Sequence, residues 1–504
     1  MNDGKGVQKL EVGIPGLDLI SEGGLPKGRS TLISGTAGSG KTVLAVQYLV
    51  EGVRRFDTGG VFVTFEEPPS QITSNMRSFG WDIEGLVARG KLAFVDASPE
   101  PGEENVETGG FDLGALMARI ESAARRVNAT RVALDSIGAT FPRFHDPDRI
   151  RRELHRIVAG LRALGVTTLI TMERTEEYGP IGRHGVEEFV ADNVVILRNQ
   201  LEAEKRRRTI EILKFRGATH QKGEFPFTVD PADGVTVIPL SAIELSQHSS
   251  TVRISSGNAE LDRMCQGGVF RDSIILVSGA TGTGKTLMVT EFMKPTLQGE
   301  GRGLLFAFEE SREQLMRNAA SWGIDYAAAE AAGKLRIVCR YPETMGLEDH
   351  LIRMKREIED FEPSRIAVDS MSALERGATV KSFREFVIGI TSHIKARETA
   401  GMFTNTTSML LGGESITETH ISTITDSIIL LRYVELQGEM RRGITVLKMR
   451  GSWHEKQIRE YVIDADGMHI RESFRGVNGI LSGQPVYSLQ GEAERLGEMF
   501  HDAG

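Results

Sequence analysis

The feature that most constrains the fold is an internal repeat, in which the second half of the chain restates the first. The segment GIPGLDLISEGG, which begins at Gly13, returns 244 positions later as GNAELDRMCQGG from Gly257. GTAGSGKT from Gly35 returns at the same spacing as GATGTGKT from Gly279. Because a repeated unit with conserved internal spacing folds the same way each time, we expect two domains of one architecture.

The spacing between the copies changes along the chain, and the change locates an insertion. It is 243 positions between Glu67 and Glu310 but 234 between Asp135 and Asp369, so the first half carries nine additional residues. We place them in SPEPGEENVETGG (98–110), an acidic stretch with Gly and Pro that is typical of a surface loop. A polar run near residues 240–252 marks the boundary between the halves. We therefore expect domains at residues 1–245 and 246–485, followed by a tail at residues 486–504.

Within each half, short apolar runs rich in β-branched residues alternate with helical stretches. In the first half the runs are STLIS, VFVTF, RVALD, TTLIT and NVVIL, and RRELHRIVAGLRAL is one of the helical stretches. Alternating strands and helices predict an α/β fold, doubly wound, with a mostly parallel sheet and helices on both of its faces.

Composition argues against several classes of protein. Lys and Arg total 60 against 69 Asp and Glu, a net charge of −9, so no global basic field attracts nucleic acid. The two cysteines match no zinc-binding spacing, which favours a reduced, cytoplasmic protein. The N-terminus lacks the apolar core of a signal peptide, and no stretch approaches the roughly 18 apolar residues of a membrane span, so we expect no membrane insertion.

The motif GxxxxGK[ST] occurs once in each half, between an apolar strand and a helical stretch. In that context a glycine-rich turn directs backbone N–H groups and a helix N-terminus at phosphate groups. We expect Lys41 and Lys285 to reach the β and γ phosphates, and Thr42 and Thr286 to bind Mg²⁺. The predicted nucleotide-binding loops comprise Gly38, Ser39, Gly40, Lys41 and Thr42 in the first half and Thr281, Gly282, Thr283, Gly284, Lys285 and Thr286 in the second. The sequence thus predicts two sites for Mg²⁺ and ATP.

An acidic residue follows an apolar strand in each half. Asp135 and Asp369 both end a strand in the pattern [LV]DS, the position from which a carboxylate completes the Mg²⁺ coordination. An isolated Asp at a strand end is more often a turn former. Its position relative to the phosphate loop favours the metal here.

Adjacent glutamates occur in both halves, after a strand that we expect beside the phosphate loop. They are Glu66 and Glu67 in the first half and Glu309 and Glu310 in the second. Repulsion between adjacent carboxylates raises one pKa and yields a base that can take a proton from water or a hydroxyl group. The alternative is a solvated helix N-terminus, where Glu is favoured anyway. Recurrence in both halves favours catalysis.

Two cations recur near the end of each half, in KFRG and KMRG. Each motif places a lysine and an arginine two residues apart on a β-like run, hence on one face. Two such cations are usually a solvated edge, but beside a nucleotide site they could neutralise phosphate charge. The residues of these motifs are Lys214, Phe215 and Arg216, and Lys448, Met449 and Arg450.

Together with GVFVTFEE, SFGWD, EEYGPI, GVEEFV, DNVVILRN, HISTITD and KMRGSWH, these motifs resemble the KaiC family of RecA-like clock ATPases over nearly the whole chain. The resemblance implies two RecA-like domains, a homohexamer of two stacked rings, and nucleotide held between neighbouring subunits, with the cations of KFRG and KMRG acting in trans. It adds Glu309 to the metal site, Ser78 and Trp322 beside the nucleotide, and His220, Ser452 and His454 on the trans side.

The two halves differ where the family carries its phosphorylation sites. Alignment of Asp192 with Asp426 sets Ser422 and Thr423 of the second half opposite Glu188 and Phe189. In the KaiC family an adjacent Ser and Thr are autophosphorylated, so the resemblance implies an ATPase first half and an autokinase and autophosphatase second half. Read alone, THISTITD is a β-branched strand whose hydroxyls form local hydrogen bonds.

The resemblance also implies partners. A KaiB-like protein would bind the first-half ring, whereas the short tail YSLQGEAERLGEMFHDAG does not look like the cyanobacterial one and argues against a KaiA-like partner. One rival function is a DNA-dependent ATPase of the RecA and helicase type, which net acidity and scarce aromatic residues disfavour. Another is a KaiC-like signalling switch without a clock role.

Overall fold

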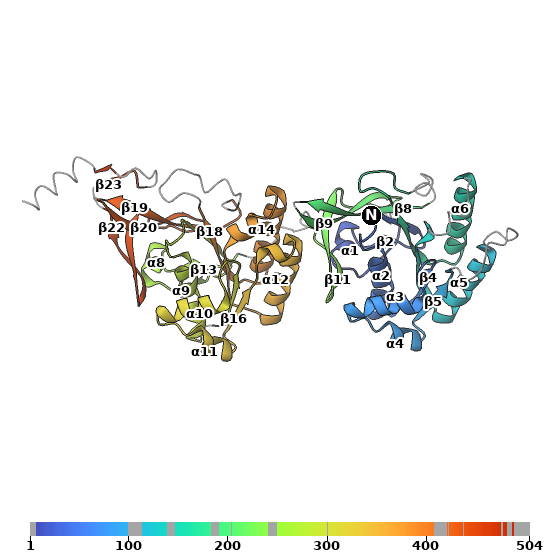
Figure 1. The fold of residues 1–504 in the computed structure, drawn as a ribbon, viewed down its shortest axis with the longest axis horizontal. Helices are drawn as coiled ribbons and strands as arrows, with labels where there is room; N and C mark the ends of the chain where they lie inside the picture. The colour runs from blue at the N-terminus through green and yellow to red at the C-terminus, as the bar shows by residue number, and fades with distance from the viewer. Residues whose placement is uncertain are drawn as a thin grey trace, which may run out of the picture. The chain divides into compact units, whose positions relative to one another are not determined.

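The structure of the chain is a computed structural model that describes residues 7–98, 113–138, 147–182, 191–202, 204–239, 249–299, 301–407, 421, 423–436, 438–474, 477–480 and 486–487. Contacts between residues divide it into two compact units, Met1–Ile243 and Glu244–Gly504 (Figure 1).

The first unit is built on one nine-stranded sheet with the strand order β11-β10-β9-β8-β3-β7-β6-β4-β5. The strands from β8 to β5 in this order are parallel, and β9, β10 and β11 add antiparallel pairs at one side. Its elements are β1 (Lys9–Leu10), α1 (Leu17–Ile20), β2 (Leu25–Pro26), β3 (Ser30–Gly35), α2 (Lys41–Phe56), β4 (Gly59–Thr64), α3 (Pro69–Met76), η1 (Arg77–Phe79), α4 (Ile83–Ala88), β5 (Leu92–Asp96), α5 (Leu113–Val127), β6 (Ala129–Asp135), α6 (Pro147–Ala163), β7 (Thr167–Glu173), β8 (Asn193–Glu202), β9 (Lys205–Phe215), β10 (Glu224–Asp230) and β11 (Gly234–Val237).

The second unit repeats this architecture. Its nine-stranded sheet has the order β16-β15-β17-β18-β14-β19-β20-β21-β22, which is the order of the first sheet in reverse. Its elements are β12 (Arg253–Ile254), α8 (Ala259–Met264), β13 (Val269–Phe270), β14 (Ile274–Gly279), α9 (Lys285–Leu297), β15 (Gly303–Ala307), α10 (Arg312–Ser321), α11 (Tyr326–Ala331), β16 (Leu335–Cys339), η4 (Pro342–Thr344), α12 (Leu347–Phe361), β17 (Arg365–Asp369), α13 (Met371–Glu375), α14 (Val380–Lys395), β18 (Ala400–Thr406), β19 (Ser427–Leu436), β20 (Glu439–Met449), β21 (Arg459–Asp464), β22 (Gly467–Ser473), β23 (Val477–Asn478) and β24 (Val486–Tyr487).

The predicted α/β class and the tandem repeat are therefore confirmed. The element boundaries also locate the insertion of the first half. β5 and β16 begin at Leu92 and Leu335, 243 residues apart, whereas α5 and α12 begin at Leu113 and Leu347, 234 apart. The nine additional residues thus lie between β5 and α5, in the part of the chain where the sequence places them.

Helices cover both faces of each sheet, which is why the central strands are apolar throughout. Every residue of β3 and of β14 is buried. In the first unit Ile33 and Phe62 pack toward α2, whereas Leu32 and Val61 pack toward α5 and α6. Successive side chains of a strand point to opposite faces, so one apolar run supplies two cores.

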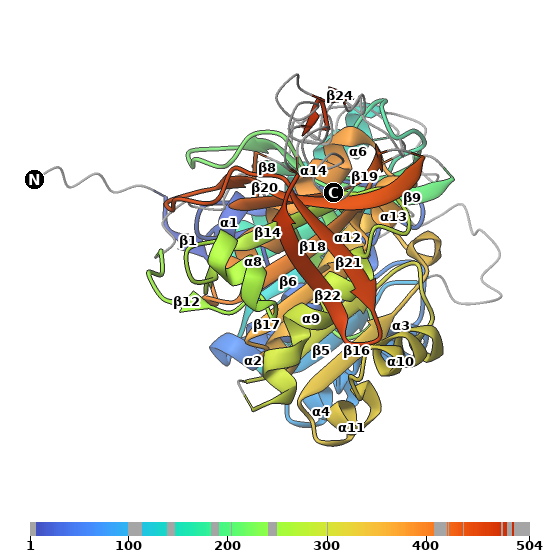
Figure 2. The ribbon, with the colours of Figure 1, turned by 90° about the vertical axis from the view of Figure 1, so that its left-hand side faces the viewer.

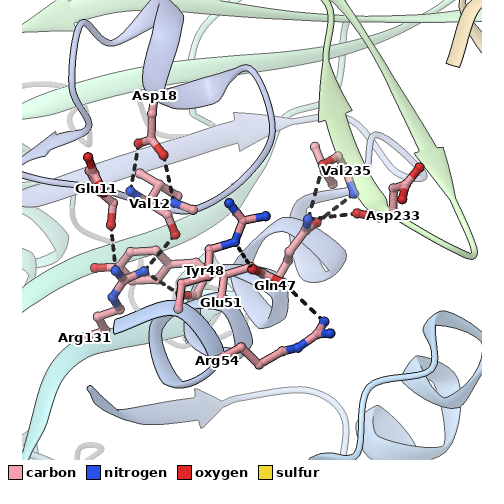
Figure 3. A network of polar contacts seen from close by, with 12 residues as sticks. Glu11, Val12, Asp18, Gln47, Tyr48, Glu51, Arg54, Arg131, Asp233 and Val235 are labelled. Carbon is pink, nitrogen blue, oxygen red and sulfur yellow. Dashed lines mark hydrogen bonds and ion pairs between the residues drawn. The ribbon is translucent and has the colours of Figure 1, made fainter. Parts of the chain in front are cut away.

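A buried arginine ties the phosphate-loop helix to the sheet in each unit. Arg131 Nη1 donates to the carbonyl oxygens of Val12 and Tyr48 at 2.8 and 2.9 Å (Figure 3). Arg365 Nη1 donates at 3.2 Å to the carbonyl oxygen of Phe292 in α9. A buried charge requires such partners, and these carbonyl groups fix α2 and α9 relative to β6 and β17.

The helices of the described residues include none long and apolar enough to span a membrane.

Candidate nucleotide sites

Each phosphate loop ends in a glycine that the backbone geometry requires. Gly40 has φ of 96° and caps α2, and Gly284 has φ of 95° and caps α9. Both lie in the left-handed region that favours glycine. With no side chain in the way, the first N–H groups of each helix can point at an anion, which is the arrangement that binds phosphate.

The two loop lysines fold back onto their own loops. Lys41 Nζ donates to the carbonyl oxygens of Gly35 and Thr36 at 2.9 and 2.8 Å, and Lys285 Nζ makes the equivalent pair of contacts at 2.9 Å. Burial lowers the pKa of both lysines, and nearby carboxylates act in the opposite sense. Each ammonium group therefore stands at the start of its helix, where a phosphate would replace the carbonyl oxygens as its partner.

The residues predicted to hold Mg²⁺ come together in the second unit. Thr286 Oγ1 donates to Asp369 Oδ2 at 2.8 Å, and Thr404 Oγ1 on the neighbouring strand donates to Asp369 Oδ1 at 2.5 Å. Burial raises the pKa of Asp369. In the first unit Thr171 Oγ1 donates to Asp135, the counterpart carboxylate.

A hydroxyl and a carboxylate beside a phosphate loop are oxygen ligands of the kind Mg²⁺ uses together with nucleotide phosphates. Thr286 and Asp369 fit that ion, because their oxygens already lie 2.8 Å apart. Thr42 and Asp135 occupy the corresponding positions in the first unit. Among the described residues, acidic, His and Cys side chains form no cluster of three that would hold a metal without the nucleotide.

The prediction that the glutamate pairs follow a strand next to the phosphate-loop strand is wrong. β7 and β6 separate β4 from β3, and β18 and β17 separate β15 from β14. Strand order depends on how the crossover helices pack, which a local pattern does not encode. The pairs still share the carboxyl-terminal edge of the sheet with the loops, since the charges of Glu66 and Glu309 act on Lys41 and Lys285.

One glutamate of each pair is held by an asparagine. Asn75 Nδ2 donates to Glu67 at 3.2 Å, and Asn318 Nδ2 donates to Glu310 at 3.0 Å. Burial raises the pKa of Glu310, and the charges of Asp369 and Glu309 raise it further. In the second unit, Glu310 is therefore a carboxylate with a raised pKa, as the sequence predicts for one member of the pair.

The other glutamate of each pair has a different partner in each unit. Ser136 Oγ donates to Glu66 at 2.8 Å, whereas Arg376 forms an ion pair with Glu309. Glu309, which the family resemblance places at the metal site, forms its ion pair with Arg376, and its charge also acts on Asp369. Its role as a metal ligand stays a prediction.

The cations of KFRG and KMRG lie at the opposite edge of the sheet. Lys214 Nζ donates to the carbonyl oxygen of Ala191 at 2.9 Å, and Lys448 Nζ to that of Thr425 at 2.7 Å. These carbonyls precede β8 and β19, which run parallel to the phosphate-loop strands and begin where those strands begin. Arg216 and Arg450 lie in the turns just after β9 and β20.

The predicted phosphorylation segment adjoins the second-half cations. Arg450 Nη2 donates to the carbonyl oxygen of Thr423 at 2.6 Å, and Thr423 itself is exposed. Asp426 Oδ2 accepts the N–H of Ile274, the first residue of β14, at 2.9 Å. Ser422 lies outside the described residues, as do Glu188 and Phe189 of the first half.

The remaining predicted contacts fall into two groups. Phe215 and Met449 are 8% and 6% exposed and pack in the cores of their own units, so only their backbone atoms are available to a nucleotide. Ser78 Oγ donates to the carbonyl oxygen of Asn75, which places it near Glu67, and Trp322 is half-buried at the end of α10.

The residues expected on the trans side lie near the cations. The His220 ring packs edge-on against Phe215. Arg253 Nη2 donates to Ser452 Oγ at 2.5 Å, and His454 is half-buried.

Sequence reasoning missed four residues that position this chemistry. They are Thr171 and Thr404, which donate to the aspartates, and Asn75 and Asn318, which hold the glutamates. Asn75 and Asn318 recur at the 243-residue spacing of the glutamate pairs, so an exhaustive comparison of the two halves would have found them.

Comparison with known proteins identifies the family. The model of the KaiC ATPase family matches residues 10–242 and again residues 254–474. The chain is 64% identical over 497 residues to the circadian clock protein KaiC3 of Synechocystis sp., covering 99% of this chain and 98% of that protein. It is 57% identical over 480 residues to the circadian clock oscillator protein KaiC of Thermostichus vulcanus, covering 95% and 92%.

A further relative is the circadian clock oscillator protein KaiC of Picosynechococcus sp., 56% identical over 492 residues, which are 98% of this chain and 95% of that protein. The residues matched by the family model include both phosphate loops and both nine-stranded sheets rather than one motif. The chain therefore belongs to the KaiC family of ATPases, with one copy of the family's ATPase domain in each half.

Proposed function

We propose that the first half hydrolyses ATP and that the second half is a Ser/Thr autokinase and autophosphatase, both using Mg²⁺, in a homohexamer that serves biological timing. The observation that carries the trans part of this proposal is the position of the cations relative to the phosphate loop of the same unit. The relatives named circadian clock proteins support the timing role.

Within one unit, the phosphate loop and the cations lie at opposite ends of the same strand. In the second unit the loop begins after Gly279, the last residue of β14, whereas Asp426 accepts the N–H of Ile274, the first residue of that strand. Thr423 lies three residues before Asp426, and its carbonyl oxygen accepts Arg450 Nη2. Five strand steps at about 3.3 Å each put some 17 Å between these ends. Lys448, Arg450 and the acceptor segment are therefore out of reach of their own phosphate loop and suit one on a neighbouring subunit.

A cationic pocket supports the same geometry in the first unit. Its volume is about 580 Å³, and it is lined by Lys27, Gly28, Arg29, Arg162, Asp192, Arg216 and Gly217. Arg29 Nη1 donates to the carbonyl oxygen of Arg216 at 2.5 Å and so fixes the turn that carries this arginine. The predominance of positive charge suits the phosphates of a nucleotide bound to a neighbouring subunit.

In the first half we assign water as the nucleophile, because no hydroxyl aligns with the acceptors there. Bound Mg²⁺ would neutralise charge on the β and γ phosphates. Thr42 and Asp135 would hold the ion, and Lys41 would leave its loop carbonyls to bind the phosphates. Glu66 or Glu67 would accept the proton as the water oxygen attacks the γ phosphorus and ADP leaves.

In the second half the acceptor is Ser422 or Thr423 of the neighbouring subunit. Its hydroxyl oxygen bonds to the γ phosphorus, the bond to the β–γ bridging oxygen breaks, and the hydroxyl proton passes to Glu310. The raised pKa of Glu310 suits a group that must accept this proton and later return it in dephosphorylation. Lys448 and Arg450 would stabilise the transferred charge.

A mixing experiment tests the trans geometry. Full-length chains carrying Ser422→Ala and Thr423→Ala are mixed with chains carrying Lys285→Ala, and phosphate is mapped by mass spectrometry after incubation with MgATP. We expect phosphate on the Lys285→Ala chains, which cannot bind second-half ATP themselves. If the Lys285→Ala chains carry no phosphate in this mixture, although wild-type chains incubated alone are phosphorylated, transfer takes place within a subunit and the proposal is wrong.

Membership of the KaiC family is the only support for the predicted protein partners. A KaiB-like protein is proposed for the first-half ring, a KaiA-like partner is not, and the tail at residues 488–504 lies outside the described residues. A cytoplasmic location likewise stays a prediction. The DNA-dependent alternative is tested by ATPase assays with and without single-stranded DNA, where we expect equal rates.

A further inference from the structure

The segment that follows β7 binds the first-half phosphate loop through one carboxylate. Thr36, the first residue after β3, donates from Oγ1 to Glu177 Oε1 at 2.6 Å. The other oxygen of that carboxylate accepts the backbone N–H of Asn199 in β8 at 3.0 Å. Glu177 therefore connects the loop to the strand on its other side.

The connection reaches both the lysine and the middle of the loop. The carbonyl oxygen of Thr36 accepts Lys41 Nζ at 2.8 Å, so the residue held by Glu177 is also the one on which the lysine rests. The side chain of Asn199 donates to the carbonyl oxygen of Gly38 at 3.4 Å. The charge of Glu177 also acts on Lys41.

The segment itself is anchored independently of the loop. Arg174 Nη2 donates to the carbonyl oxygen of Gly179 at 2.6 Å and closes the turn. The Tyr178 ring lies 5.0 Å from the guanidinium carbon of Arg198. Glu177 is thus presented to the loop from a fixed turn, and it can hold Thr36 in place.

The second half keeps the lysine and the glycine of the loop but replaces Thr36, Glu177 and Asn199. Ala280 stands where the first half has Thr36, a leucine (Leu410 or Leu411) aligns with Glu177, and Tyr433 aligns with Asn199. The simultaneous loss of donor and acceptor indicates that the contact itself, rather than either residue alone, distinguishes the first half.

A different hydroxyl holds the second-half loop. Tyr461 Oη donates to the carbonyl oxygen of Thr283 at 2.5 Å, and the corresponding strand position in the first half is Phe227, which has no hydroxyl. Different hydroxyl groups therefore hold the two loops, that of Thr36 in the first half and those of Tyr461 and Thr283 in the second.

We propose that Glu177 is a positioning residue for ATP in the first half, which acts by fixing Thr36 and with it the phosphate loop. A loop already held in place loses less conformational freedom when the nucleotide binds, so the contact raises affinity. This inference deepens the proposed function and depends on ATP binding at Lys41.

The test measures MgATP affinity and the kcat and KM of hydrolysis in the full chain with Lys285→Ala, which leaves the first site alone. Hydrogen bonds to charged groups are strong enough for about a tenfold loss of affinity, so we expect that loss in Thr36→Ala and in Glu177→Gln, expressed in KM rather than kcat. The double variant should lose no more than the stronger single variant, because both remove one contact. Thr36→Ser, which keeps the hydroxyl, should recover most of the affinity.

Glu176→Gln is the matched control, because it removes the same charge one residue away on an exposed side chain. If Glu177→Gln tightens ATP binding, or if Glu176→Gln has the same effect as Glu177→Gln, charge rather than positioning governs the site and the inference is wrong. Unchanged affinity in Thr36→Ala also overturns it. Failure of the proposed function is separate: Lys41→Ala would then leave first-half ATP binding intact.

Discussion

The helices α2 and α9, which follow the two phosphate loops, each bind the edge strand of their sheet through one side chain. That side chain is an amide in the first unit and a carboxylate in the second. In the first unit Gln47 accepts the N–H of Val235 at 2.7 Å and returns its own amide hydrogens to the carbonyl oxygens of Asp233 and Val235 (Figure 3). In the second unit Glu291 accepts the N–H of Met468 at 2.8 Å but has no hydrogen to return.

Asn258 supplies the hydrogen-bond donor that the Glu291 carboxylate lacks. Its Nδ2 donates to Glu291 at 3.0 Å and to the carbonyl oxygen of Met468 at 2.8 Å. Figure 2 shows the hairpin of β21 and β22 beside α9, the region that this contact joins. One backbone requirement therefore has two solutions, and only the second introduces a buried ionisable group.

The largest expected difference between the halves concerns the glutamate pairs. Glu66→Gln with Glu67→Gln should lower first-half ATP hydrolysis by about 10²–10⁴-fold while ATP stays bound, because a general base contributes about that much. Steady-state ATPase rates in a chain that also carries Lys285→Ala measure this. Undiminished hydrolysis would show that neither glutamate is the general base.

The matching substitutions in the second half are Glu309→Gln and Glu310→Gln, made separately. Glu310→Gln should slow phosphorylation of the acceptors more than Glu309→Gln, since Arg376 already neutralises Glu309. Phosphopeptide quantitation over time distinguishes the two. Equal effects would contradict the assignment of Glu310 as the base.

A smaller effect is expected from truncating the two helix residues. Glu291→Ala leaves the Met468 N–H without its acceptor, and Gln47→Ala does the same to Val235. We expect each to cost about 1–3 kcal/mol per unsatisfied buried group. Hydrogen exchange at these two amides reports each unit separately, and each variant should speed exchange only in its own unit.

The pH dependence of stability should also differ between the units. Burial is the main cause that raises the pKa of Glu291 above its ordinary value of 4.5, so the native state binds this proton more tightly than the unfolded chain does. The contribution of Glu291 to stability is therefore full below pH 4.5 and is lost as pH rises through the raised native pKa. Gln47 does not titrate. Exchange of the Met468 amide should show this slope, and Glu291→Gln should abolish it.

The smallest effect should come from a surface pair that only the first half has. Arg77 Nη2 lies 2.8 Å from Glu84 Oε1, both side chains are 69% exposed, and the second half has Ala320 and Ala327 at these positions. Replacing both with alanine should change the free energy of unfolding by less than about 1 kcal/mol. A larger loss in denaturant titration would mean that the halves differ in surface charge as well as in their buried groups.

The sequence predicted local structure well where local pattern decides it. The runs STLIS, VFVTF, RVALD, TTLIT and NVVIL all form strands, and RRELHRIVAGLRAL lies in α6. Asp135 and Asp369 end β6 and β17 as expected, because an apolar run followed by a polar residue marks a strand end regardless of context.

Long-range arrangement was harder to predict. The place of β4 in the sheet depends on crossover packing, and the contact between Thr36 and Glu177 joins residues 141 positions apart. Nothing near either residue indicates the other. The repeat itself was the usable signal, since positions where the two halves diverge together proved to be positions in contact.

The placement of complementary groups at the two ends of β3 and of β14 also limits how chains can associate. A two-fold dimer joins a surface to itself, so it would set loop edge against loop edge and leave every cationic edge exposed. Loop edge against cationic edge is a head-to-tail contact, which each chain can repeat in both directions. Such contacts either close into a ring or continue as a filament. Only in a closed ring does every phosphate loop meet the cationic edge of a neighbour. Under the proposed trans geometry, activity per chain should fall on dilution, because opened rings leave phosphate loops without cations.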